Sequence, residues 1–186
     1  MSENLRNYTR AVYTVDAVVN RMPPQAWDRP SPCEGWTARE VLGHFMWGMQ
    51  SITSAAHGGD RPAVRSEAEV ATDEPTVAWA ATRDELLAAL DHQGALQRTF
   101  TGPFGPSTID AFLAVHTLDG ILHAWDIARA GGIEACVPVD LALAGTAAIE
   151  GLGDVVRQPG LFGPAVDCPA DADPVSRFVA VAGRRP

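Results

Sequence analysis

The segment from Ser107 to Ala130 is apolar around most of a helical circumference, and this feature constrains the fold more than any other in the chain. At 100° per residue, four polar positions fall within one sector of roughly 80°. They are His116, Asp119, His123 and Asp126. A helix that is apolar on most sides is usually buried, so this polar sector is predicted to face an internal cavity or cleft.

Apolar residues at alternating steps of three and four predict further helices along the chain. These helices span residues 5–22, 37–55, 75–92 and 138–157. Thr37 and Glu40 fit a capping box at the start of the second of them. The polar segment 60–73 has no period and is expected to be a surface loop.

Smaller elements complete the predicted fold. Residues 97–100, followed by Gly-Pro-Phe-Gly-Pro at 102–106, indicate a short strand or hairpin. The tail is expected to hold a strand at 165–168 and a short helix at 175–182. The chain is therefore predicted to be mainly all-α and to form one domain over residues 1–186, with a helical bundle over about 1–158 and an irregular tail over about 159–186.

Composition excludes several classes of function. A net charge of −9 without a basic cluster argues against a nucleic-acid partner. No apolar run approaches the roughly 20 residues of a membrane-spanning helix. The first residues lack the charged and then apolar layout of a signal peptide. A cytoplasmic protein without membrane contact is therefore expected. Three widely spaced cysteines, Cys33, Cys136 and Cys168, do not suggest a disulfide framework.

A second histidine, His44, lies in the apolar stripe of the predicted helix 37–55. A buried histidine needs a polar partner, and two packed helices could bring His44 to the sector that holds Asp119 and His123. Two imidazoles and a carboxylate are a common ligand set for zinc, and they leave a position open for water or substrate. The pattern thus indicates a catalytic type of metal site.

Simpler interpretations exist for the same residues. The sector could be a solvated face with incidental histidines, or His116 and His123 could form hydrogen bonds to Asp119 and Asp126 without any metal. His44 by itself could be a core histidine with a satisfied hydrogen bond.

Two motifs resemble those of a known family. Residues 32–37 (Pro-Cys-Glu-Gly-Trp-Thr) and 39–44 (Arg-Glu-Val-Leu-Gly-His) resemble the first motif of the mycothiol-dependent maleylpyruvate isomerase-like proteins of the DinB/YfiT superfamily. Residues 119–130, with Asp119, His123 and Asp126, resemble the second motif. Residues 171–174 and 183–186 are similar to the tail of an uncharacterised metal-binding branch.

The resemblance implies a DinB-type four-helix bundle that holds a divalent metal, usually zinc or nickel, with His44, Asp119 and His123 as its ligands. Many relatives carry Glu where Asp119 stands. His116 has no fixed role in the family pattern and is expected to be a neighbour of the ligands or a spare ligand. The resemblance also implies mycothiol as a cosubstrate and a homodimer.

Other residues near the motifs have two interpretations each. Asp126 could accept a proton from the far nitrogen of His123 or act as a catalytic base. Cys33 lies near the positive end of a helix, where a thiolate is stabilised, or it is a packed small residue. Three tryptophans could line a substrate pocket or belong to the core. They are Trp36, Trp47 and Trp125.

The sequence therefore leaves three functions open. The first is a metal-dependent enzyme, a thiol transferase or isomerase that uses a low-molecular-weight thiol on a small electrophilic substrate. The second is a non-catalytic metal-binding or stress-associated protein, and the third is a purely structural helical domain.

Overall fold

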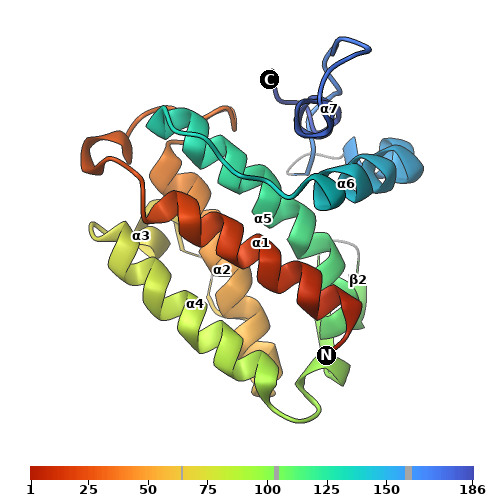
Figure 1. Ribbon diagram of the computed structural model, residues 1–186. Helices are drawn as coiled ribbons and strands as arrows, with labels where there is room; N and C mark the ends of the chain where they lie inside the picture. The colour runs from red at the N-terminus through yellow and green to blue at the C-terminus, as the bar shows by residue number, and fades with distance from the viewer. Residues whose placement is uncertain (64, 103–104, 158–160) are drawn as a thin grey trace. The chain divides into compact units, whose positions relative to one another are not determined.

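The computed structural model describes residues 1–63, 65–102, 105–157 and 161–186 (Figure 1). They are mainly helical, with one two-stranded sheet in this part of the chain, so the predicted mainly α fold class is confirmed. The chain divides into two compact units, Met1–Ala135 and Cys136–Pro186. The expected boundary at 158–159 falls outside the described residues, and the single domain stays a prediction. No described helix is long and apolar enough to cross a membrane.

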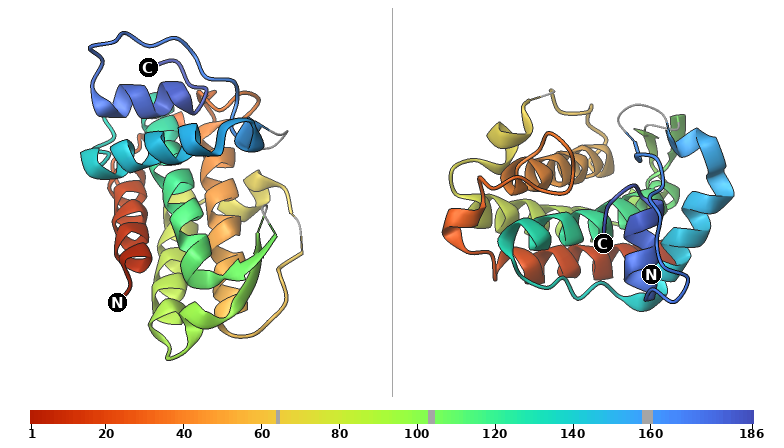
Figure 2. Two further views of the ribbon diagram at one scale, coloured as in Figure 1. Left: turned by 90° about the vertical axis from the view of Figure 1, so that its right-hand side faces the viewer. Right: turned by 90° about the horizontal axis from the view of Figure 1, so that it is seen from above.

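Four long helices build the first unit. They are α1 (Glu3–Val19), α2 (Ala38–Ala56), α4 (Pro75–Asp91) and α5 (Ile109–Gly131). Helix α1 packs along α5, and α2 packs against both α4 and α5 (Figures 1 and 2). The core between them holds Leu113, Ala124 and Ile127 of α5. The apolar sides of α5 are thus buried among the other long helices, as its sequence predicts.

The ends of α2 and α5 follow the chemistry of their capping residues. Thr37 and Glu40 form the predicted capping box, in which the Thr37 N–H donates to Glu40 Oε2 at 2.8 Å. The Thr108 hydroxyl accepts from the Ala111 N–H at the start of α5. Helix α5 ends at Gly132, whose φ of +68° favours glycine. These capping residues define where α2 and α5 begin and where α5 ends.

The predicted loop over 60–73 is wrong in part, because it contains the short helix α3 (Glu67–Ala71). Ser66 and Glu69 form a capping box at its start. Helix α3 packs on α2 where Gly43 has no side chain, since a Cβ atom at Gly43 would lie 1.8 Å from the backbone oxygen of Glu67.

The Gly43→Ala variant is expected to lose about 1–3 kcal/mol of unfolding free energy, because the added methyl group meets backbone that cannot rotate away. Denaturant unfolding measures this loss. The matched control is Gly151→Ala, where a helical Cβ would find nothing within 4 Å and should be neutral or stabilising. Equal stability of the two variants would contradict the close α2–α3 contact.

A hairpin connects α4 to α5. After the short 3-10 helix η2 (Ala95–Gln97), the strands β1 (Thr99–Gly102) and β2 (Gly105–Thr108) pair antiparallel. Thr99 lies opposite Thr108. The predicted hairpin is therefore present, although two residues of its Gly-Pro-Phe-Gly-Pro turn, 103 and 104, lie outside the described part.

The second unit contains α6 (Val139–Leu152), the 3-10 helix η3 (Gly153–Arg157) and α7 (Pro174–Val181). Helices α6 and α7 pack against each other. The helix predicted to reach residue 157 stops earlier, at Gly153, whose φ is +55°. The short helix predicted at 175–182 is confirmed.

The strand predicted at 165–168 is wrong. In this described segment the Val166 N–H donates to the Ala180 carbonyl at the end of α7, at 3.0 Å, and no ladder forms. One hydrogen bond to a helix end thus replaces strand pairing.

Candidate metal centre

The packing of α2 against α5 brings the three predicted ligands together. His44 comes from α2, whereas Asp119 and His123 lie one turn apart on α5. One potential ligand atom from each residue lies within 4.8 Å of the others. The two helices that carry them run through the first unit in Figure 1.

The carboxylate of Asp119 lies close to both imidazoles. His123 Nε2 is 3.2 Å from Asp119 Oδ1, and His44 Nε2 is 4.0 Å from Asp119 Oδ2. The side chain of His123 is only 5% exposed, but those of His44 and Asp119 are 35% and 27% exposed. The cluster is therefore reachable from solvent on the side of His44 and Asp119.

A neighbouring carboxylate orients His123. The Nδ1 atom of His123 lies 3.0 Å from Asp126 Oδ2, and Asp126 is fully buried. A carboxylate accepts a hydrogen bond, so Nδ1 donates to Asp126 and Nε2 is the nitrogen that faces the cluster, where an ion would displace its proton. This arrangement is typical of metal-binding histidines, and the residues fit a divalent ion. The catalytic role of Asp126 stays a prediction.

The charges of the cluster set its protonation in the absence of an ion. Burial lowers the pKa of His44 despite the nearby Asp119. Burial also lowers the pKa of His123, but the charges of Asp119 and Asp126 and the hydrogen bonds to them raise it to about 9. Burial raises the pKa of Asp119, yet the histidines around it outweigh this and hold it well below its usual value. His44 is thus neutral, whereas His123 carries a proton that an ion must displace.

His116 lies beside the cluster and not in it. Its Nε2 atom is 3.7 Å from Asp119 Oδ2, and its Nδ1 atom is 2.9 Å from the hydroxyl of Tyr8. Burial lowers the pKa of His116 to about 4. The ligand atoms that converge come from the three other residues. Of the two roles expected for His116, the geometry matches that of a neighbour. No motif or spacing in the sequence singles out Tyr8 as a neighbour of the site.

Trp36 covers the histidines of the cluster. Its ring lies 4.8 Å from that of His44 and 6.5 Å from that of His123, measured between centroids. The preceding loop holds it there, because the Ser31 hydroxyl donates to the Trp36 carbonyl at 2.8 Å and accepts from the Cys33 N–H at 3.1 Å. Cys33 is half-buried and packed against the core. This position agrees with its interpretation as a packed residue.

The other two tryptophans stack against arginines. Arg61 lies 4.0 Å from the ring centroid of Trp47, and Arg129 lies 5.3 Å from that of Trp125. Trp47 also packs against the core. Of the three tryptophans predicted to line a pocket, the described ring contacts bring only Trp36 to the site histidines.

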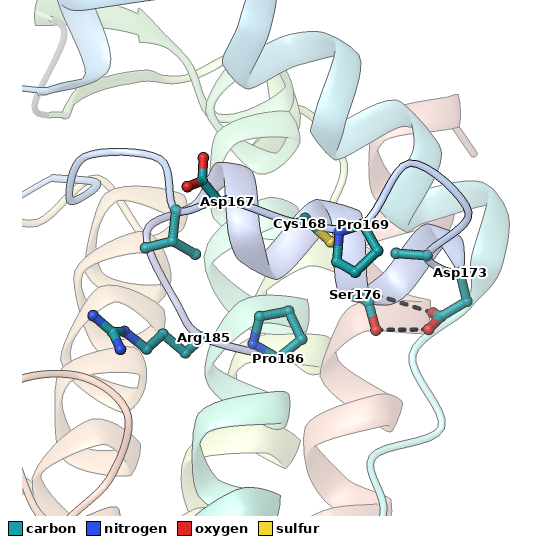
Figure 3. A pocket seen from close by; sticks show the side chains of 9 residues that line it. Asp167, Cys168, Pro169, Asp173, Ser176, Arg185 and Pro186 are labelled. Carbon is teal, nitrogen blue, oxygen red and sulfur yellow. Dashed lines mark hydrogen bonds between the residues drawn. The ribbon is translucent and has the colours of Figure 1, made fainter.

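A separate pocket of about 630 Å³ lies in the second unit, between α7 and the residues near the C-terminal end (Figure 3). It contains none of the predicted site residues. The Asp173 carboxylate at its edge caps α7, because it accepts from the Val175 and Ser176 N–H groups and from the Ser176 hydroxyl. Asp173 is thus already engaged in helix capping, and the three predicted ligands lie together on α2 and α5, so that cluster is the stronger candidate.

Comparisons with known proteins identify the family of the chain. Residues 8–128 match the family model of the mycothiol maleylpyruvate isomerase N-terminal domain. The uncharacterized protein Rv0738 of Mycobacterium tuberculosis is 31% identical over 157 residues, which cover 83% of each chain. The uncharacterized protein Rv0036c of the same organism is 26% identical over 145 residues, 64% of this chain and 52% of that one.

A solved structure has a similar fold. It is the crystal structure of a mutant of the mycothiol-dependent maleylpyruvate isomerase, with a TM-score of 0.60 and 16% sequence identity. The match covers 79% of this chain and 68% of the other. At this identity the likeness concerns the fold alone.

Proposed function

The chain belongs to the family defined by the mycothiol maleylpyruvate isomerase N-terminal domain, and on this premise we propose that it is a metal-dependent enzyme that uses a low-molecular-weight thiol of the mycothiol type. It acts as an S-transferase or isomerase on a small electrophilic substrate. The observation that carries this function is the convergence of His44, Asp119 and His123 at a point that solvent reaches.

These three side chains hold one divalent ion, zinc in the first place and nickel as the alternative. Two nitrogen ligands and one oxygen ligand suit either ion. Three protein ligands leave at least one position open, as in catalytic zinc sites, whereas structural sites are closed by four. The donor set thus favours a reactive centre over a structural one.

A bound ion at this place supplies positive charge that lowers the pKa of a thiol or water beside it. The protein contributes orientation and shelter. Asp126 fixes the tautomer of His123, as their 3.0 Å contact indicates. Trp36 packs beside His44, and a substrate approaches past the exposed parts of His44 and Asp119. Asp126 as a base remains part of this proposal.

Metal analysis tests the ligand set. We expect about one zinc or nickel ion per chain in the native protein after supplementation, and a loss of this ion in His44→Ala. The matched control is His57→Ala, which changes an exposed histidine at the C-terminal end of the same helix. Equal metal content in His44→Ala and His57→Ala would contradict the assignment of His44.

Turnover in the presence of a thiol tests the enzymatic role. With a low-molecular-weight thiol present, the metal-loaded protein should convert small electrophiles of a panel. An S-transferase consumes the thiol, whereas an isomerase releases it again and rearranges the substrate. Chelation should abolish this reaction, and added zinc or nickel should restore it. A fully loaded protein without turnover across the panel would support the non-catalytic metal-binding alternative. A homodimer, which the family resemblance implies, and a cytoplasmic location are also proposed. Sedimentation measures the oligomeric state.

A further inference from the structure

The ring of His116 is held in a slot of the first unit. It stacks against Phe45 at 4.6 Å and an interplanar angle of 18°, and against Phe112 at 5.7 Å and 23°. Gly48 of α2 makes room for it, because a Cβ atom there would lie 2.3 Å from His116 Nε2. The ring thus has little freedom to turn, and the directions of its two nitrogens are fixed.

Those two nitrogens have different partners. Nδ1 lies 2.9 Å from the hydroxyl of Tyr8, which is fully buried on α1. Nε2 lies 3.7 Å from Asp119 Oδ2, beyond hydrogen-bond length but close enough for a strong electrostatic effect. His116 therefore connects a buried hydroxyl on one helix to a proposed metal ligand.

A neutral imidazole carries one N–H, and the surroundings decide which nitrogen has it. With the proton on Nδ1, the lone pair of Nε2 would face the negative Oδ2 of Asp119, and the two would repel each other. With the proton on Nε2, the N–H dipole attracts Oδ2, and Nδ1 accepts a hydrogen bond from the Tyr8 hydroxyl. The second arrangement satisfies both contacts.

We propose that Tyr8 and His116 are positioning residues for Asp119: the Tyr8 hydroxyl donates to Nδ1 of His116, which directs the Nε2–H of His116 toward Oδ2 of Asp119. The carboxylate is then held from one side while Oδ1 stays beside His123 Nε2, 3.2 Å away. A ligand held in place before the ion arrives loses less freedom on binding. This role rests on the proposed metal site and adds two residues to it.

The Tyr8→Phe variant tests the role of the hydroxyl. It keeps the ring in the core and removes only the donor to His116. We expect its affinity for zinc, measured by competition with a chelator, to fall about 10-fold, the lower end of the range for outer partners of metal ligands. The matched control is Tyr13→Phe on the same helix, whose side chain is exposed and whose affinity should not change.

A second pair of variants separates positioning from packing. His116→Gln retains an N–H near the place of Nε2, whereas His116→Leu does not, so the glutamine should retain more of the zinc affinity. Tyr8→Phe should have no further effect in the His116→Gln background, because the amide needs no hydroxyl to fix its donor. A purely packing role would instead give His116→Gln and His116→Leu the same zinc affinity.

The outcomes distinguish this inference from the function on which it rests. A native protein that binds no zinc or nickel would overturn the metal site itself. Tight binding by the native protein with equal affinities for Tyr8→Phe and Tyr13→Phe would overturn only the positioning role. If Tyr8→Phe does not fold, the comparison of His116→Gln with His116→Leu decides, and equal affinities there overturn the role.

Discussion

The His123→Ala variant is expected to bind zinc at least about 100-fold more weakly than the native protein, because it loses one of the three proposed side-chain ligands. The same change removes the hydrogen bond that His123 Nδ1 makes to the fully buried Asp126. The loss of such a hydrogen bond by a buried carboxylate lowers the free energy of unfolding by about 1–3 kcal/mol. Chelator competition and denaturant unfolding measure the two effects.

The control for this variant is His92→Ala, which changes an exposed histidine at the end of α4. It should leave both zinc affinity and stability close to the native values. Unchanged zinc affinity in His123→Ala would show that the ion, if bound, lies elsewhere. A large loss of affinity without a loss of stability would instead show that Asp126 has sufficient other partners.

The long helices could be predicted from the sequence because their signals are local. Apolar spacing repeats over four or more turns, and caps such as Thr37 with Glu40 mark where a helix begins. Helix α3 was missed because five residues are too few for a period. Its capping box, Ser66 with Glu69, is a signal that would have located it. A short apolar run such as 165–168 forms a strand only when a partner strand lies beside it. Here Val166 instead makes a hydrogen bond to the end of α7.

The candidate site was predictable to the extent that it lies on one helix. Asp119 and His123 are one turn apart, so their proximity follows from spacing alone. The addition of His44 depends on how α2 packs against α5, which the family resemblance implied and periodicity did not. Tyr8 shows where such reasoning ends: it lies 108 residues from His116, and its place in an apolar stripe is the same as that of an ordinary core residue.

The affinity for zinc or nickel is expected to rise about 10-fold per pH unit between pH 6.5 and 8. In the metal-free protein, burial lowers the pKa of His123, but Asp119 and Asp126 raise it to about 9, so the ion must displace one proton. His44, whose pKa is lowered by burial, is already neutral in this range and adds no slope. Metal titrations in buffers of increasing pH measure the slope, and calorimetry in buffers of different ionisation heat measures the proton released.

The same protonation gives the metal-free protein a pH-dependent stability of definite sign. Because folding raises the pKa of His123, the contribution of His123 to the free energy of unfolding is fully present below the ordinary histidine value of about 6.5 and is lost as the pH rises through about 9.

The Asp126→Asn variant keeps the shape of the side chain but removes one of the charges that raise the pKa of His123. Its metal affinity should therefore level off at lower pH than that of the native protein. A native affinity that is flat between pH 6.5 and 8 would contradict a protonated His123 and leave the ion no proton to displace.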